Sequence, residues 1–143
     1  MFKFFKKKVL MQLDKGGFMP KRAHNYDAGF DLFSSEDYYI KARQTRKVDT
    51  KVHVSIPKGY VGFVLPRSSV SAQGIHVATG VIDTGYMGKI SIVVTAPYDI
   101  RVIKGERIAQ LVIVKAPVFE LQQSDRFFSK TERGFNGFGS TGK

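Results

Sequence analysis

The sequence predicts an all-β protein, built as a sandwich or barrel of short strands. Apolar residues recur at every second position more often than at the 3.6-residue period of a helix. Val52, Val54 and Ile56, for example, alternate with polar neighbours. Short strands that are closely separated by turn residues are typical of sandwiches and barrels. The clearest turns lie at residues 57–59, 97–99 and 104–106.

The strand pattern is clearest in four parts of the chain, and a helix pattern occurs once. Residues 68–73 form the helix candidate, because Ser68 or Ser69 is suited to capping its first turn and Gly74 to ending it. The chain shows no repeat, linker or domain boundary, so we expect one β domain over residues 1–132, followed by a tail, 133–143. The expected strands are residues 51–56, 59–65, 89–95 and 108–114.

The net positive charge of the chain favours negatively charged partners. A length of 143 residues suits one domain with a buried core, and the net charge of +11 attracts polyanions. Nucleic acid and a nucleoside triphosphate both satisfy this charge. The sequence has neither zinc-finger spacing nor an RNA-binding aromatic block. No specific nucleic-acid binding is therefore expected.

The composition also bears on the compartment. The absence of cysteine excludes disulfides and fits a reducing environment. No apolar run approaches the length of a membrane span. The basic and aromatic start, residues 1–8, lacks the apolar core of a signal peptide and is expected to lead, solvated, into the first strand. We expect a cytoplasmic protein without membrane contact.

The glycine-rich tail, residues 133–142, cannot hold itself as helix or strand, because glycine loses the most backbone entropy on ordering. A frayed terminus is the simplest interpretation. Arg133, however, offers a forked cation for phosphate oxygens, and Phe138 offers a flat face for stacking. Ser140 and Thr141 add hydroxyl donors. We expect a functional flap that becomes ordered when a phosphorylated base binds.

A second candidate phosphate site precedes the helix candidate. Arg67, Ser68 and Ser69 lead directly into this helix. A helix N-terminus presents unpaired N–H groups and partial positive charge, which favour an anion. The alternative is an ordinary capped helix with a surface arginine, and these residues alone favour neither interpretation.

Residues 80–90, GVIDTGYMGKI, predict a β-hairpin, since Thr84 and Gly85 suit a tight turn between apolar arms. Asp83 is expected at the mouth of this hairpin and Tyr86 on its turn. An aspartate beside a turn is often only a turn former. The functional alternative is a general base that takes a proton from water. Tyr86 is suited equally to packing on a sugar ring or on the core.

The chain resembles the trimeric dUTP pyrophosphatase (dUTPase) family in segments that follow one another in the family's order. The segments are residues 28–37, 66–69, 80–90, 104–113 and 133–142. The resemblance implies a jelly-roll subunit and a homotrimer whose active sites take residues from more than one subunit. It also implies Mg²⁺-assisted hydrolysis of dUTP to dUMP and pyrophosphate. Such an enzyme keeps uracil out of DNA and supplies dUMP for dTMP synthesis, and we expect a bacterial or viral source.

The same resemblance implies roles for individual residues. Asp83 matches the carboxylate that activates the attacking water, and Tyr86 matches the aromatic ring under the deoxyribose. Asp31 matches a carboxylate that supports Mg²⁺ through water only. The other matched residues bind uracil, phosphate or the closing tail. They are Val81, Ile82 and Ser91 for uracil, Arg67, Ser68, Ser69 and Gln110 for phosphate, and Arg133, Phe138, Gly139, Ser140 and Thr141 for the tail.

The chain departs from the common family pattern in the predicted hairpin. Met87 and Lys89 stand where Arg and Glu are frequent. A charge pair is lost there, which is expected to affect subunit contacts and not the site.

Two rival functions remain at this point. dCTP deaminase, a relative with the same fold, needs a glutamate where this chain has Val93. A dUTPase-like regulatory protein would act by binding a partner. The presence of Asp83, Tyr86 and the glycine-aromatic tail favours the pyrophosphatase over both rivals.

The three histidines, His24, His53 and His76, show no spacing suited to metal. His53 and His76 each stand among alternating strand residues. All three are expected to have structural or surface roles.

Overall fold

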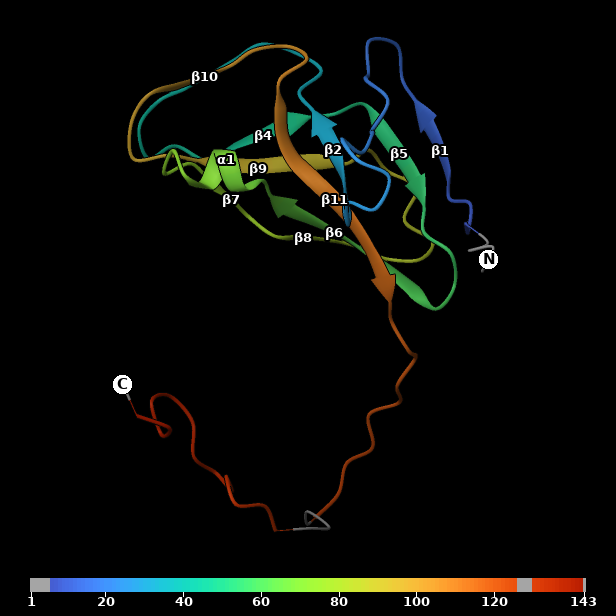
Figure 1. Cartoon of the computed structure of the whole chain (residues 1–143), viewed down its shortest axis with the longest axis vertical. Helices are drawn as coiled ribbons and strands as arrows, with labels where there is room; N and C mark the ends of the chain where they lie inside the picture. The colour runs from blue at the N-terminus through green and yellow to red at the C-terminus, as the bar shows by residue number, and fades with distance from the viewer. Residues whose placement is uncertain (1–5, 126–129, 143) are drawn as a thin grey trace.

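The structure is a computed structural model that describes residues 6–125 and 130–142. Residues 1–5 of the basic start and Lys143 of the expected tail lie outside the described residues. The described chain is largely β structure with one short helix (Figure 1). The elements are β1 (Leu10–Leu13), β2 (Gly29–Phe33), β3 (Tyr38–Ile40), β4 (Arg46–Asp49), β5 (Val52–Ser55), β6 (Tyr60–Pro66), α1 (Ser68–Ser71), β7 (His76–Val77), β8 (Gly80–Ile82), β9 (Ser91–Thr95), β10 (Ile100–Val102) and β11 (Arg107–Lys115).

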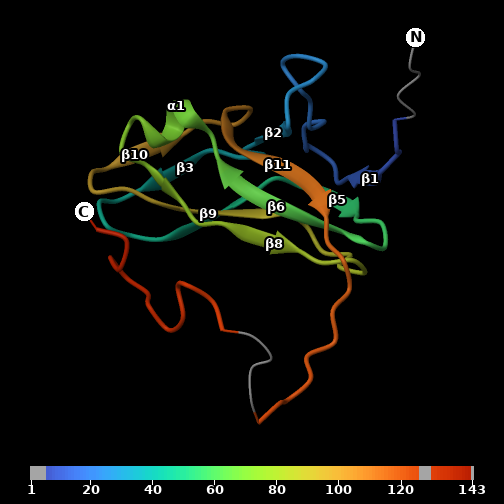
Figure 2. The same ribbon diagram turned by 60° about the horizontal axis from the view of Figure 1, so that its bottom comes forward.

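The strands form two larger sheets and two strand pairs. The 4-stranded sheet has the order β2-β11-β6-β8, and the 3-stranded sheet has the order β4-β9-β7. β1 pairs with β5 and β3 pairs with β10, and every pairing is antiparallel. Figure 2 shows β11 beside β6. The chain leaves the strand-containing part of the structure, residues 10–115 (the β body), after β11. The predicted all-β, jelly-roll class is confirmed.

The core joins the two larger sheets, and the period-two pattern explains its composition. In β5, Val52 and Val54 are buried, and in β9 Ile92 and Val94 are buried, while the residues between them are more exposed. Buried residues of both sheets belong to one apolar cluster. The strands predicted from this alternation are confirmed, and they correspond to β5, β6, β9 and β11.

Strand β11 departs from strict alternation close to the pocket described below. Its pairing with β2 shifts register between Arg107 and Ala109, and Ile108 and Ala109 are buried in succession. A bulge inserts an extra residue and redirects the side chains that follow it. Arg107 and Gln110 can therefore face the same side of the sheet, although strict alternation would put them on opposite sides.

The hairpin predicted over residues 80–90 is wrong as a strand pairing, although its turn is present. The amide of Tyr86 donates to the carbonyl of Asp83 at 3.2 Å. Strand β8, however, pairs with β6, whereas β9 pairs with β4 and β7. Ile82 packs opposite Gly62 of β6, whose missing side chain leaves room for it. The chain therefore crosses from one sheet to the other through this turn.

The helix candidate is confirmed, but it is shorter than expected. It covers Ser68–Ser71, and its N-cap is Arg67, which makes no side-chain cap hydrogen bond. The expected serine cap is therefore wrong. Beyond the helix, Gly74 has a φ of 74° and donates its N–H to the carbonyl of Ser71 at 2.9 Å. Over the described chain, no helix has the length and hydropathy to cross a membrane.

The glycine-rich tail forms tight turns outside the β body (Figures 1 and 2). Residues 130–142 are exposed and contain neither helix nor strand, as their composition predicts. Several hydrogen bonds run within the segment. The Nε of Arg133 donates to the carbonyl of Asn136 at 3.0 Å, and the amide of Ser140 donates to the carbonyl of Gly137 at 2.9 Å.

Candidate active site

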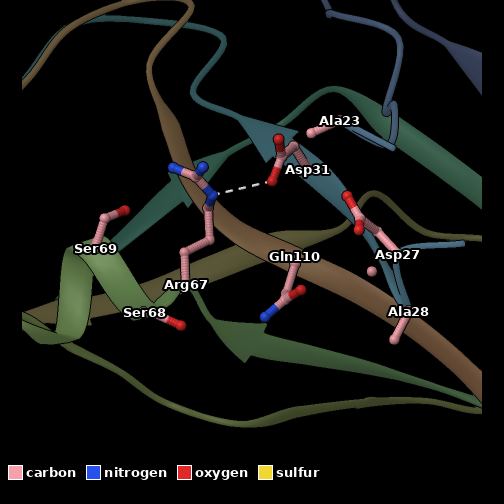
Figure 3. Close-up of a pocket in the computed structure, with 9 residues that line it drawn as sticks. Ala23, Asp27, Ala28, Asp31, Arg67, Ser68, Ser69 and Gln110 are labelled. Carbon is pink, nitrogen blue, oxygen red and sulfur yellow. Dashed lines mark ion pairs between the residues drawn. The ribbon is translucent and has the colours of Figure 1, made fainter. Parts of the chain in front are cut away.

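A polar pocket of about 460 Å³ lies where β2, β6 and β11 meet the start of α1 (Figure 3). Strand β11 lies between β2 and β6, so that Gln110 is opposite Asp31 on one side and Leu65 on the other. Arg67 directly follows β6. The structure thus brings together residues of three predicted segments. The pocket is lined by Ala23, Asp27, Ala28, Gly29, Asp31, Arg67, Ser68, Ser69 and Gln110.

An ion pair orients the arginine of this pocket. The Nε of Arg67 lies 3.0 Å from Oδ1 of Asp31, and their side chains are only 26% and 14% exposed. Arg107 approaches the other carboxylate oxygen at 3.5 Å, and its carbonyl accepts a hydrogen bond of 3.4 Å from Nη1 of Arg67. A guanidinium has further N–H donors, and its planar fork matches phosphate. Arg67 is therefore held in place at a polar pocket suited to an anion.

Gln110 is positioned by the backbone of the neighbouring strands. Its Nε2 donates to the carbonyl of Pro66 at 3.0 Å. On the other side, a Cβ added to Gly29 would overlap the Gln110 side-chain amide. A side chain at this position of β2 would therefore force the Gln110 amide to move from the place it holds here.

Asp83 and Tyr86 do not line this pocket. They lie in the turn after β8, where Asp83 is exposed. Tyr86 is 45% exposed and lines a separate cavity of about 580 Å³ with residues of β1 and β5. Its hydroxyl donates to the carbonyl of Lys89 at 2.9 Å. Within one chain, the predicted water-activating carboxylate and the predicted phosphate site belong to separate surfaces.

The residues predicted to contact uracil also lie outside the pocket. Val81 is 57% exposed in β8, which is an edge strand of its sheet, whereas Ile82 is buried. Ser91 begins β9 and is exposed, opposite Asp49 of β4. An edge strand presents a row of backbone N–H and C=O groups. This part of the chain is therefore suited to recognition by backbone atoms.

Lys89, at the end of the same turn, gains a partner within the chain. Its Nζ lies 2.6 Å from Oδ2 of Asp49. Burial raises the pKa of Asp49, but hydrogen bonds from Lys89 and from the amide of Lys51 outweigh it and hold this pKa below its ordinary value. The same hydrogen bond raises the pKa of Lys89. The ion pair between Lys89 and Asp49 connects the end of the turn to β4.

The pocket has few ligands for a metal ion. In the part of the chain that the structure describes, no group of three or more His, Cys, Asp or Glu side chains is placed to hold one. Mg²⁺, however, usually keeps several waters and binds one or two carboxylates together with substrate phosphates. The oxygen donors at the pocket, which belong to Asp27, Asp31, Ser68 and Ser69, fit such a site.

Sequence patterns did not indicate Ala23 and Asp27, which line the pocket, or Arg107, which contacts Asp31. Asp27 adjoins the segment that carries the family resemblance, and this adjacency was the available signal. Arg107 lies within another segment of the resemblance, 104–113, but its side of the strand was not predictable. Counting alternate positions from Gln110 puts it on the wrong face of β11, because the bulge is not visible in the sequence.

Comparison with known proteins gives the family. A family model described as dUTPase matches residues 16–142. The deoxyuridine 5'-triphosphate nucleotidohydrolase of Tropheryma whipplei (strain Twist) is 39% identical over 137 residues, which cover 92% of this chain and 93% of that protein. The protein of the same name from Mycobacterium sp. (strain JLS) is 40% identical over 144 residues, with 94% of each chain covered.

Solved structures agree with this assignment. The dUTPase of Staphylococcus bacteriophage 80alpha, solved with dUpNHpp, has a TM-score of 0.92 and 36% identity, covering 96% of this chain and 100% of that one. A variant dUTPase from phage phi11 of S. aureus, whose structure shows the coordination of a structural Mg(II) ion, has a TM-score of 0.80 and 31% identity, covering 85% and 99%. The resemblance found in the sequence is confirmed, and the chain belongs to the dUTPase family.

Proposed function

We propose that this enzyme hydrolyses dUTP to dUMP and pyrophosphate, with Mg²⁺, in the cytoplasm. The observation that supports this most strongly is the pocket in which Asp31, Arg67 and Gln110 converge from three segments of the family pattern. Hydrolysis of this substrate removes dUTP before a polymerase can use it and supplies dUMP.

The triphosphate would lie in the polar pocket. Arg67 and the hydroxyls of Ser68 and Ser69 provide charge and donors for phosphate oxygens, and Gln110 provides an amide. Asp31 would orient waters of Mg²⁺, which supplies charge neutralisation for the triphosphate when bound. The ion pair between Asp31 and Arg67 keeps both groups at the pocket before substrate arrives.

The base and sugar would be recognised by the turn and its flanking strands. Uracil would bind backbone groups of Val81 and Ile82 and the start of β9 near Ser91. Rigid strand edges fix the positions of such donors and acceptors. Tyr86 would lie under the deoxyribose, and a 2'-hydroxyl would be excluded by contact with its ring.

Asp83 would carry out the chemistry. Its carboxylate positions a water in line with the α-phosphorus and takes a proton as the new P–O bond forms. The bond from the α-phosphorus to the bridging oxygen breaks, and pyrophosphate leaves. In the tail, Arg133 would contact phosphate and Phe138 would stack on the base, with Gly139, Ser140 and Thr141 beside them. Closure of the tail would exclude bulk water from the reaction.

The separation of Asp83 from the pocket supports a shared site. We infer a homotrimer in which the turn of one subunit meets the pocket of another, and in which the tail reaches a neighbouring site.

We expect Asp83→Asn and Arg67→Ala homotrimers each to be nearly inactive. Refolding the two variants together in equal amounts should restore about a quarter of the sites, since each restored site needs one intact half from each variant.

Dilution of the two pre-formed variant trimers into one assay, without refolding, is the control and should restore nothing. The absence of recovery after refolding, in mixed trimers verified by differently tagged subunits, would contradict the shared site.

The experiment that tests the proposed function is release of pyrophosphate from dUTP, dCTP, dTTP and UTP in the presence of Mg²⁺. We expect selective hydrolysis of dUTP. Release of ammonia from dCTP would favour the deaminase, although Val93 is half-buried in β9 and offers no group that titrates. A folded protein that hydrolyses none of these nucleotides would favour a regulatory role.

A further inference from the structure

His53 connects the turn that carries Asp83 to the end of β1. It lies in β5, and its side chain is 25% exposed. Its Nδ1 lies 2.8 Å from the carbonyl oxygen of Met87, the residue after Tyr86. Its Nε2 lies 3.2 Å from Oδ2 of Asp14, which follows β1. One imidazole ring thus spans two segments that are distant in sequence.

The chemistry of these two contacts favours the charged ring. A carbonyl oxygen and an ionised carboxylate can only accept hydrogen bonds. Neutral imidazole donates from one nitrogen and presents a lone pair at the other, so it satisfies only one of the two partners. The imidazolium donates to Met87 and Asp14 together.

The other contacts of the turn act on residues on either side of Met87, including the hydrogen bond from the Tyr86 hydroxyl to the carbonyl of Lys89 at 2.9 Å. Thr84 donates its hydroxyl to the carbonyls of Pro57 and Tyr60 at 3.2 and 3.3 Å, which fixes the beginning of the turn. The ion pair of Lys89 with Asp49 fixes its end. Between these points the Met87 side chain is 84% exposed and does not anchor the backbone by burial.

The cavity beside this contact connects it to the proposed substrate site. His53, Gly85, Tyr86 and Met87 line the same cavity of about 580 Å³. A change in the hydrogen bond to the Met87 carbonyl acts on the residue adjacent to Tyr86. The position proposed for the Tyr86 ring, under the deoxyribose, therefore depends on the backbone at Met87 that His53 contacts.

The contacts of the His53 ring favour its protonated form. The Met87 carbonyl and then the Asp14 carboxylate raise the pKa of His53 above its ordinary value, against the opposing effects of burial and of Lys89. Because the pKa is higher in the folded chain, the protonated contact stabilises the fold fully below the unfolded-state pKa. This stabilisation is lost as the pH rises through the folded-state pKa.

We propose that His53 is a positioning residue, which in its protonated form holds the Asp83–Lys89 turn in its active conformation and makes turnover sensitive to pH. This role rests on the proposed function, since it acts through Asp83 and Tyr86. When His53 loses its proton, one of its two contacts is lost and the turn is held less firmly.

The test compares full-length wild type with His53→Gln, whose amide can donate to Met87 and cannot become charged. At pH 6 we expect kcat of the variant to be about tenfold lower than that of wild type, the scale of a small misplacement of a reacting group. Above the folded-state pKa of His53 the two rates should converge, because the wild-type ring is then neutral. A rate ratio that does not change with pH would overturn the proposal.

Two further variants and an NMR titration separate this role from a structural one. Asp14→Asn should lower the pH at which the His53 ring titrates and should move the change in kcat with it. His76→Gln, at an exposed position of β7, is the matched control and should alter neither. A titration midpoint unchanged by Asp14→Asn would contradict the proposal.

The titration also separates failure of this proposal from failure of the proposed function. The methyl signal of Met87 should shift with the same midpoint as the His53 ring without any nucleotide. If it does so in a protein that does not hydrolyse dUTP, the contact of His53 with the turn is supported and the assigned activity is wrong. If dUTP is hydrolysed and the Met87 signal does not shift with the titration of the His53 ring, the proposed role of His53 is wrong.

Discussion

Asp83→Asn should remove most of the turnover of dUTP, with a loss of about 10²–10⁴-fold in kcat, the usual contribution of a general base. The amide has nearly the shape of the carboxylate but cannot accept the proton from water. The turn itself should survive, because the hydrogen bond that closes it uses the backbone carbonyl of Asp83 and the amide of Tyr86 at 3.2 Å. Asp83 is also exposed, so its replacement leaves no cavity in the core.

The measurements are kcat from pyrophosphate release, the affinity for dUpNHpp by calorimetry, and the thermal unfolding midpoint. Only kcat should change strongly. Asp37→Asn is a matched control, since Asp37 is likewise an exposed aspartate and accepts a hydrogen bond from the amide of Lys104 at 2.7 Å. Turnover at the wild-type rate in Asp83→Asn would show that another group activates the water.

Removal of residues 133–143 should leave the fold intact and reduce kcat/KM for dUTP by about 10²-fold or more, the scale expected when a charge-stabilising donor is lost. Residues 133–142 are exposed and several of their hydrogen bonds stay within the segment, so truncation should leave the core unchanged. The loss arises because the site then lacks Arg133 and Phe138 and remains open to water.

A comparison of the two phenylalanines of the tail shows whether the effect is specific. Phe135 is 96% exposed and Phe138 is fully exposed, so neither contributes to the core. Phe138→Ala should raise KM for dUTP, whereas Phe135→Ala should behave as wild type. Full activity of the truncated protein, with an unchanged unfolding midpoint, would refute a functional flap.

Local features of the sequence predicted the strands and the phosphate segment. The alternation at Val52 and Val54 marks a strand because successive side chains in a strand point to opposite faces. Arg67, Ser68 and Ser69 are neighbours in the chain, so any fold that ends a strand at Pro66 brings them to one place. The tail contains no regular structure because its glycines oppose ordering.

The position of Arg107 required the tertiary structure. Its place beside Asp31 depends on a bulge in β11, which the sequence does not mark. The pairing of β8 with β6 likewise depends on the fit of Ile82 against Gly62, two residues from different strands. Each of these features is decided by register between distant segments, and register responds to the packing of whole faces.

The sequence by itself therefore determined the all-β class, the family, and the identity of the residues proposed for catalysis. The tertiary structure alone decided that Asp31, Arg67 and Gln110 share a pocket, that Asp83 lies outside it, and that His53 meets Met87 and Asp14. The physical reason is one of range. Periodicity and turn chemistry act over a few neighbouring residues, whereas a site depends on how strands from opposite ends of the chain align and pack.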